Sequence, residues 1–148
     1  MTKLFNSTFE VSLRVLLLLS QTTDANMTLD RLVMYDFISV YGRHFDMADI
    51  NLHGDNEYGF SELSARRTVM QAALKELVLD GLIKASRRQE GFCYEITGLG
   101  TAFCKKQTTA YAETYRKLAI ATHKKYKGMT EVEIMAVISS KAIHALRR

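Results

Sequence analysis

The sequence predicts a mainly α-helical fold with a small β-hairpin: a winged-helix-like domain with a long C-terminal helix and a terminal helix. Three observations lead to this prediction. Proline is absent from the 148 residues, which suits a chain of helices because proline interrupts them. A Ser/Thr-x-x-Glu capping box precedes an apolar run near each end of the chain. Between the boxes, one stretch changes from a helical period to the period of two that is typical of strands.

The first helix should extend over residues 8–20, because Ser7 and Glu10 form the first capping box. Its apolar side chains cover nearly the whole circumference, unlike the single stripe of a surface helix. Something must therefore cover both sides. Either this is a central helix wrapped by its own chain, or it is the best candidate for burial against another subunit.

A second helix should begin after Thr28 as its N-cap and extend to about Tyr41, with Asp36 interrupting its apolar stripe. Residues 42–60 then form an irregular arm that is rich in glycine and acidic residues and has few apolar ones. The acidic side chains of this arm are Asp46, Asp49, Asp55 and Glu57.

The best-defined helix is predicted over residues 61–80 and should end at Gly81. A helical wheel gives it an apolar side with Val69, Met70, Ala73, Leu74 and Leu77, and an opposite side with Ser64, Arg67, Thr68, Gln71 and Lys75. Residues 82–88 and 92–96 then alternate as two strands of a hairpin, joined by a turn at residues 89–91.

The chain after the hairpin should be helical. Residues 101–127 are expected to form one long helix, and the second capping box, Thr130 with Glu133, begins a terminal helix. The apolar stripe of the long helix is Phe103, Tyr111, Tyr115 and Leu118. We expect residues 1–100 to form the winged-helix-like core and residues 101–148 to be a helical extension packed on that same core.

Several side chains suit contact with nucleic acid or with an acidic partner protein. In DNA-binding winged helices, the helix before the hairpin enters the major groove and the hairpin contacts the backbone. Residues 1–60 carry a net charge of −4 and residues 61–148 a net charge of +8, so the basic field is C-terminal. The candidate contacts are Arg67, Gln71, Lys75, Lys84, Arg87, Arg88, Lys124, Lys125 and Lys127.

The arm argues against sequence-specific reading of DNA. A helix-turn-helix joins its two helices by about three or four residues, whereas residues 42–60 intervene here and bring negative charge toward any phosphate. We therefore favour a winged helix that docks onto proteins, with nonspecific DNA contact left open. A winged-helix transcriptional regulator is the alternative.

Arg66 lies at the end of the apolar side of its helix and needs an anionic partner there. Glu62, one turn earlier, is the simplest choice, and Asp36 on the second helix is the tertiary alternative. We interpret this as a structural ion pair, so removing the charge of Arg66 should lower the melting temperature.

The sequence contains no recognisable catalytic motif. His44 and His53 flank Asp46 and Asp49 without metal-ligand spacing, and the common nucleotide, zinc, calcium and nucleophile motifs are missing. We expect no enzyme activity, no cofactor and no metal. Cys93 and Cys104 are predicted to be small core residues. No apolar run is long enough to span a membrane, and no secretory leader begins the sequence, so a cytoplasmic location is expected.

Six short stretches between about residues 5 and 120 resemble the middle-component family of bacterial three-component SMC-like ATPase systems, which include the Lamassu type of phage defence. They are residues 5–10 (FNSTFE), 13–18 (LRVLLL), 32–36 (LVMYD), 61–63 (SEL) with Arg66 and Arg67, 81–83 (GLI) and 91–94 (GFCY). None of these stretches carries a catalytic motif.

The resemblance implies an accessory subunit that joins an SMC-like coiled-coil ATPase, which senses DNA, to an effector that is often a nuclease. It implies no active-site residues, and it leaves the roles of Arg66, Arg67 and Asp36 open. The function expected from the sequence is thus a non-catalytic scaffold in an anti-phage defence complex.

Overall fold

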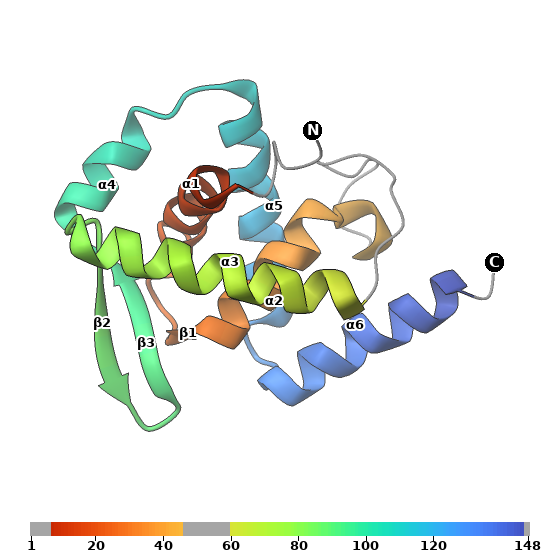
Figure 1. Cartoon of the computed structure of the whole chain (residues 1–148). Helices are drawn as coiled ribbons and strands as arrows, with labels where there is room; N and C mark the ends of the chain where they lie inside the picture. The colour runs from red at the N-terminus through yellow and green to blue at the C-terminus, as the bar shows by residue number, and fades with distance from the viewer. Residues whose placement is uncertain (1–6, 46–59, 147–148) are drawn as a thin grey trace.

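The computed structural model describes residues 7–45 and 60–146. Within these ranges the chain is mainly helical and has one small antiparallel sheet, which confirms the predicted fold class (Figure 1). In chain order the elements are α1 (Thr8–Leu19), β1 (Met27–Thr28), α2 (Leu29–Val40), the 3-10 helix η2 (Gly42–Phe45), α3 (Phe60–Leu79), β2 (Ile83–Arg88), β3 (Gly91–Ile96), α4 (Gly98–Lys105), α5 (Ala110–Tyr126) and α6 (Glu131–Leu146). The four acidic residues predicted in the arm lie outside the described residues.

The predicted starts of α1, α2 and α6 are confirmed by their capping hydrogen bonds. The Ser7 hydroxyl accepts from the Glu10 amide at 3.2 Å, and Thr28 caps α2. At α6 the box is reciprocal, because the Thr130 hydroxyl accepts from the Glu133 amide at 3.1 Å while the Glu133 carboxylate accepts from the Thr130 amide at 2.7 Å. Each cap satisfies an amide that the first helical turn leaves without a backbone partner.

Gly81 ends α3 as predicted. Its φ of +74° is the left-handed conformation that favours glycine, and the Leu82 amide bonds back to the Leu77 carbonyl at 3.0 Å. This turn sends the chain directly into β2.

The sheet has the strand order β1-β3-β2, and both pairings are antiparallel. The predicted hairpin of β2 and β3 is confirmed, with Ile83 opposite Ile96 and Arg87 opposite Phe92. Strand β1, which pairs Met27 with Tyr94, was not predicted, because two residues are too few to show an alternating pattern.

Helix α1 lies at the centre of the molecule. Helix α3 packs on α1 and α2 from one side, and α5 packs on the same two helices from the other. Val15, Leu17 and Leu18 have no exposed surface. Of the two explanations for its apolar circumference, the central helix is therefore right. The alternative, burial of α1 against another subunit, is wrong for these buried residues. Phe9, which is 73% exposed, and the partly buried Leu13 remain at the surface and line a groove.

The single long helix expected over residues 101–127 is wrong, because the chain turns between α4 and α5. Lys106 closes α4, and the Thr109 hydroxyl begins α5 by accepting from the Ala112 amide at 3.1 Å. Threonine competes for backbone hydrogen bonds in helix interiors and favours caps, which explains the break at this point. Buried residues of α5 and α6, among them Tyr115 and Ile134, belong to the same apolar cluster as α1.

A buried ionic network joins α1, α2 and α3 at the core. Asp36 accepts two hydrogen bonds from Arg14, at 2.9 and 3.2 Å, and one from Arg66 at 3.1 Å. The Tyr115 hydroxyl donates a fourth at 2.7 Å, and Arg66 also pairs with Glu62 at 3.3 Å. Both partners predicted for Arg66 are thus confirmed. The role of Arg14 was missed, although an arginine inside an otherwise apolar buried helix signals a buried partner.

Asp36 should make stability depend on pH in the acid range. Burial raises the pKa of this carboxyl, but the nearby charges of Arg14 and Arg66 outweigh burial and bring the pKa to about 2, from 3.8 in an unperturbed aspartate. Because the folded pKa is the lower one, the stabilisation is complete above about pH 5 and is lost as pH falls toward 2. We expect the free energy of unfolding, measured by urea titration, to fall more steeply over this range in wild type than in Asp36→Asn.

Candidate partner-docking surface

Helix α3 separates a buried side from an exposed side as the helical wheel predicts. Met70, Ala73 and Leu77 are buried against the core. The five residues predicted on the opposite side, Ser64, Arg67, Thr68, Gln71 and Lys75, are all exposed. This exposed side borders three grooves.

The first, called here the α3–hairpin groove, has a volume of about 410 Å³ and lies between the C-terminal half of α3 and one face of the hairpin. Its lining residues are Leu29, Gln71, Leu74, Lys75, Val78, Leu79, Ala85, Phe92 and Tyr94. The residues of α3 follow the spacing i, i+3, i+4, i+7, which keeps them on one stripe. Leu79 is 73% exposed and Phe92 is 55% exposed, so a large apolar surface faces solvent here.

The strand register divides the basic residues of the hairpin between its two faces. Arg87 lies opposite Phe92, and its guanidinium sits 5.2 Å from the centre of that ring, on the face that borders the groove. Lys84 and Arg88 alternate with it and so belong to the other face, where Lys84 pairs with Glu95 at 3.3 Å. The three hairpin residues predicted as contacts, Lys84, Arg87 and Arg88, therefore do not lie on one face of the hairpin.

The second, the α1–α4 groove, has a volume of about 690 Å³ and lies on the other side of α3. Phe9 and Phe103 line it from α1 and α4. Lys75 and Leu79 line both this groove and the α3–hairpin groove. The two grooves therefore share a rim at the C-terminal end of α3.

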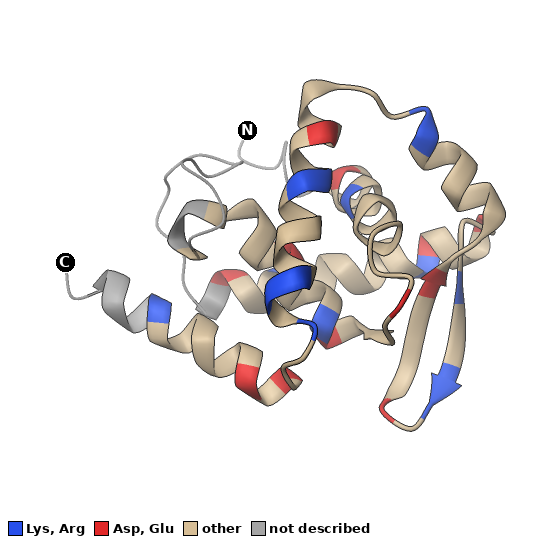
Figure 2. Cartoon of the chain, turned by 180° about the vertical axis from the view of Figure 1, so that it is seen from behind, with Lys and Arg blue, Asp and Glu red and all other residues tan. Residues whose placement is uncertain are grey.

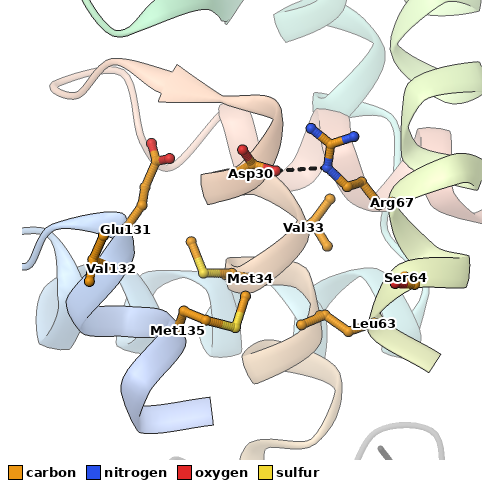
Figure 3. Close-up of a pocket in the computed structure, with 9 residues that line it drawn as sticks. All are labelled: Asp30, Val33, Met34, Leu63, Ser64, Arg67, Glu131, Val132 and Met135. Atoms are coloured by element: carbon orange, nitrogen blue, oxygen red, sulfur yellow. Dashed lines mark hydrogen bonds and ion pairs between the residues drawn. The ribbon is translucent and has the colours of Figure 1, made fainter. Parts of the chain in front are cut away.

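The third, the α2–α6 groove, has a volume of about 580 Å³ and lies at the N-terminal end of α3 (Figure 3). Its lining residues are Asp30, Val33, Met34, Leu63, Ser64, Arg67, Glu131, Val132 and Met135. Met34 and Met135 lie beside one another between α2 and α6, and Val132 is 80% exposed. The rim holds an exposed ion pair between Arg67 and Asp30 at 2.8 Å.

Helix α5, whose C-terminal end carries Lys124, Lys125 and the C-cap Lys127, lies on the opposite side of α1 and α2 from α3 (Figure 2). Lys124 is exposed, the ammonium of Lys125 donates to the Phe45 carbonyl at 3.2 Å, and Lys127 pairs with Asp24 at 3.0 Å. The structure therefore does not combine them with the α3 and hairpin residues into one basic surface.

His123 links a buried tyrosine to an exposed carboxylate through hydrogen bonds that sequence reasoning missed. One ring nitrogen lies 3.0 Å from the Tyr35 hydroxyl and the other 2.7 Å from the Asp24 carboxylate. The hydrogen bond from His123, together with Lys127, lowers the pKa of Asp24 to about 2. His123 is 7% exposed and Tyr35 is fully buried, and both ring nitrogens of His123 are engaged in these contacts. These hydrogen bonds connect α5 to α2 and to the turn before β1. The residues that they join are far apart in the sequence, so no local pattern predicts them.

The other sequence predictions for chemical sites fall partly within the described residues. Cys93 and Cys104 are unpaired and buried, as predicted. Across residues 7–45 and 60–146, no three histidine, cysteine, aspartate or glutamate side chains are grouped so that they could hold a metal ion. None of the helices in that part of the chain combines the length and apolar character of a membrane span. The side chain of His44, together with His53, Asp46 and Asp49, lies outside what the structure describes.

Comparison with known proteins places these surfaces in a family. Searches of curated proteins and of solved structures gave no match. The family model of Middle Component 2 of ABC-three component (ABC-3C) systems matches residues 4–148. This match covers nearly the whole chain, including every groove described above. The chain therefore belongs to the Middle Component 2 family of ABC-three component systems and is a subunit of a multi-component system.

Proposed function

We propose that the chain is a non-catalytic linking subunit of a Lamassu-type defence complex, which holds an SMC-like coiled-coil ATPase at one surface and an effector nuclease at another. The observation that carries this proposal is the presence of apolar grooves at opposite ends of α3. A linking subunit needs two surfaces that two partners can occupy at once. Membership of a middle-component family supports an accessory role.

The grooves lie toward opposite ends of α3, with α2 and α6 beside one and the hairpin beside the other. Leu63 lines the α2–α6 groove, and Val78 lines the α3–hairpin groove fifteen residues later in the same helix. At 1.5 Å per residue, this is roughly 22 Å along the helix axis. A standard protein interface buries on the order of 800 Å² per partner, so each interface must extend beyond α3, onto α2 and α6 at one end and onto the hairpin at the other.

The charges on the exposed side of α3 and on the hairpin favour a protein partner over DNA. We propose that α3 and the hairpin have a winged-helix arrangement that is used for docking. A DNA-binding surface of this kind needs several cations that are free to contact phosphates. Arg67 is instead paired with Asp30 and Lys84 with Glu95, and the strand register places Arg87 and Arg88 on opposite faces of the hairpin. Mostly apolar side chains line the groove between α3 and the hairpin.

Two matched substitutions test the linking role. The chain is co-expressed with the ATPase and the effector encoded beside it, and binding to each is measured separately. Val132→Asp places a charge in the α2–α6 groove, and Val78→Asp places one in the α3–hairpin groove. We expect each variant to weaken a different partner by tenfold or more and to keep the other.

Thermal melting is used to check that both variants remain folded, and each serves as the control for the other. Failure of the wild-type chain to bind either partner would contradict the proposal. Loss of the same single partner in both variants would also contradict it, because one interface would then span both grooves.

A further inference from the structure

We infer that the α3–hairpin groove binds an amphipathic helix of a partner protein whose apolar stripe is flanked by acidic side chains. This inference rests on the proposed linking role and names the chemistry of one of the two partners. Three observations support it: the apolar floor of the groove, the two unpaired cations beside it, and walls built from a helix stripe and a sheet face.

The floor is apolar and has no covering element among the described residues. Leu74 and Tyr94 form its base, while Val78 and Phe92 flank it with 37% and 55% of their surfaces exposed. At about 25 cal/mol per Å² of apolar surface removed from water, covering such residues is the main source of affinity that the groove offers. The partner must therefore present apolar side chains.

The charges of the groove are of one sign. Lys75 lines the groove from α3. Arg87 is not a lining residue, but its guanidinium lies over the ring of Phe92, which is one, on the same face of the hairpin. Within the described part of the chain, neither forms an ion pair, unlike Arg67, Lys84 and Lys127. No acidic residue lines the groove, since Glu76 and Asp80 line the α1–α4 groove instead. Two unpaired cations on opposite walls complement acidic side chains on both sides of an apolar stripe.

The walls favour a helix over an extended segment. An extended peptide needs a strand edge to satisfy its backbone amides and carbonyls. Strand β2 is an edge strand of the sheet, but the hairpin residues that line this groove, Ala85, Phe92 and Tyr94, share one face of the sheet and offer side chains there. The other wall is the side-chain stripe of α3. A helix satisfies its own backbone, and its period matches the spacing of Gln71, Leu74, Lys75 and Val78.

Charge reversal on the two faces of the hairpin tests the inference. Lys75→Glu with Arg87→Glu reverses the two cations of the groove, whereas Lys84→Glu with Arg88→Glu reverses two charges on the other hairpin face. Affinities for the co-expressed ATPase and effector are measured separately by titration. We expect the first double variant to weaken one partner at least tenfold and the second to change neither more than about twofold.

A photo-crosslinker then identifies the occupant. Phe92 is replaced by p-benzoylphenylalanine, which keeps an aromatic side chain in the groove, and the cross-linked peptide is sequenced by mass spectrometry. We expect a partner segment with apolar residues at helical spacing and acidic residues beside them. A cross-link to nucleic acid, or to a basic or non-helical segment, would overturn the inference.

The failures of the two proposals are distinguishable. If wild type binds neither partner, the linking role itself fails. If wild type binds both and reversal of Lys75 and Arg87 weakens neither, only the inferred occupant is wrong. DNA binding is tested by titrating a 30-base-pair duplex against the same variants. If reversal of Lys75 and Arg87 removes DNA binding but leaves partner binding intact, the two cations contact nucleic acid and the inference is wrong.

Discussion

Replacing Asp36 with asparagine is expected to destabilise the protein by about 3–5 kcal/mol, because it leaves two buried arginines without their shared anion. Arg14 is fully buried and Arg66 is 6% exposed, so water cannot take the place of the carboxylate. For a chain of this length, the loss corresponds to a fall in melting temperature of roughly 6–20 °C. Thermal unfolding followed by circular dichroism at pH 7 measures it.

Asp30→Asn is the matched control, since it removes the other Asp–Arg pair of α2. Asp30 and Arg67 are about half exposed, and exposed pairs contribute at most about 1 kcal/mol. We expect a change in melting temperature of only a few degrees. Equal effects of the two substitutions would show that the charge of Asp36 does not hold α1, α2 and α3 together.

The local parts of the fold were predictable because their signals lie within a few residues. Capping boxes located the starts of α1 and α6, and the wheel of α3 separated its buried side from its exposed side. Arg66 was also predictable, because one partner, Glu62, is a single helical turn away. The pairing of Arg14 with Asp36 was not, since it joins two helices whose relative rotation depends on packing.

The candidate site was predictable only as a set of side chains. Their types pointed to α3 and the hairpin, but the register decides that Arg87 faces the groove and that Lys84 does not. The grooves themselves depend on contacts between distant elements, such as Met34 of α2 beside Met135 of α6. No periodicity within one segment reports such a contact, which is why the apolar α1 was a misleading candidate for the interface.

Gly100→Ala is expected to destabilise the protein by about 1–3 kcal/mol, although alanine is normally the better helix former. In an open helix the change stabilises by up to about 1 kcal/mol. Here a Cβ would overlap the Leu82 carbonyl oxygen and approach Ile96 Cγ1 to 2.7 Å. The Leu82 oxygen is backbone and already accepts from the Thr97 amide at 3.1 Å, so it cannot move without disturbing the base of the hairpin. The destabilisation from this overlap should therefore exceed the stabilisation from the higher helix propensity of alanine.

The comparison that isolates this contact is Gly98→Ala, two residues earlier in α4, where a Cβ meets no atom within 4 Å. We expect Gly98→Ala to leave the melting temperature unchanged or slightly raised, and Gly100→Ala to lower it by roughly 3–10 °C. Because Gly100 packs where α3 turns into β2, the same variant should also weaken the partner that depends on Val78. A stable Gly100→Ala protein with normal partner binding would mean that α4 can shift without moving the hairpin, and that the α3–hairpin groove does not depend on this contact.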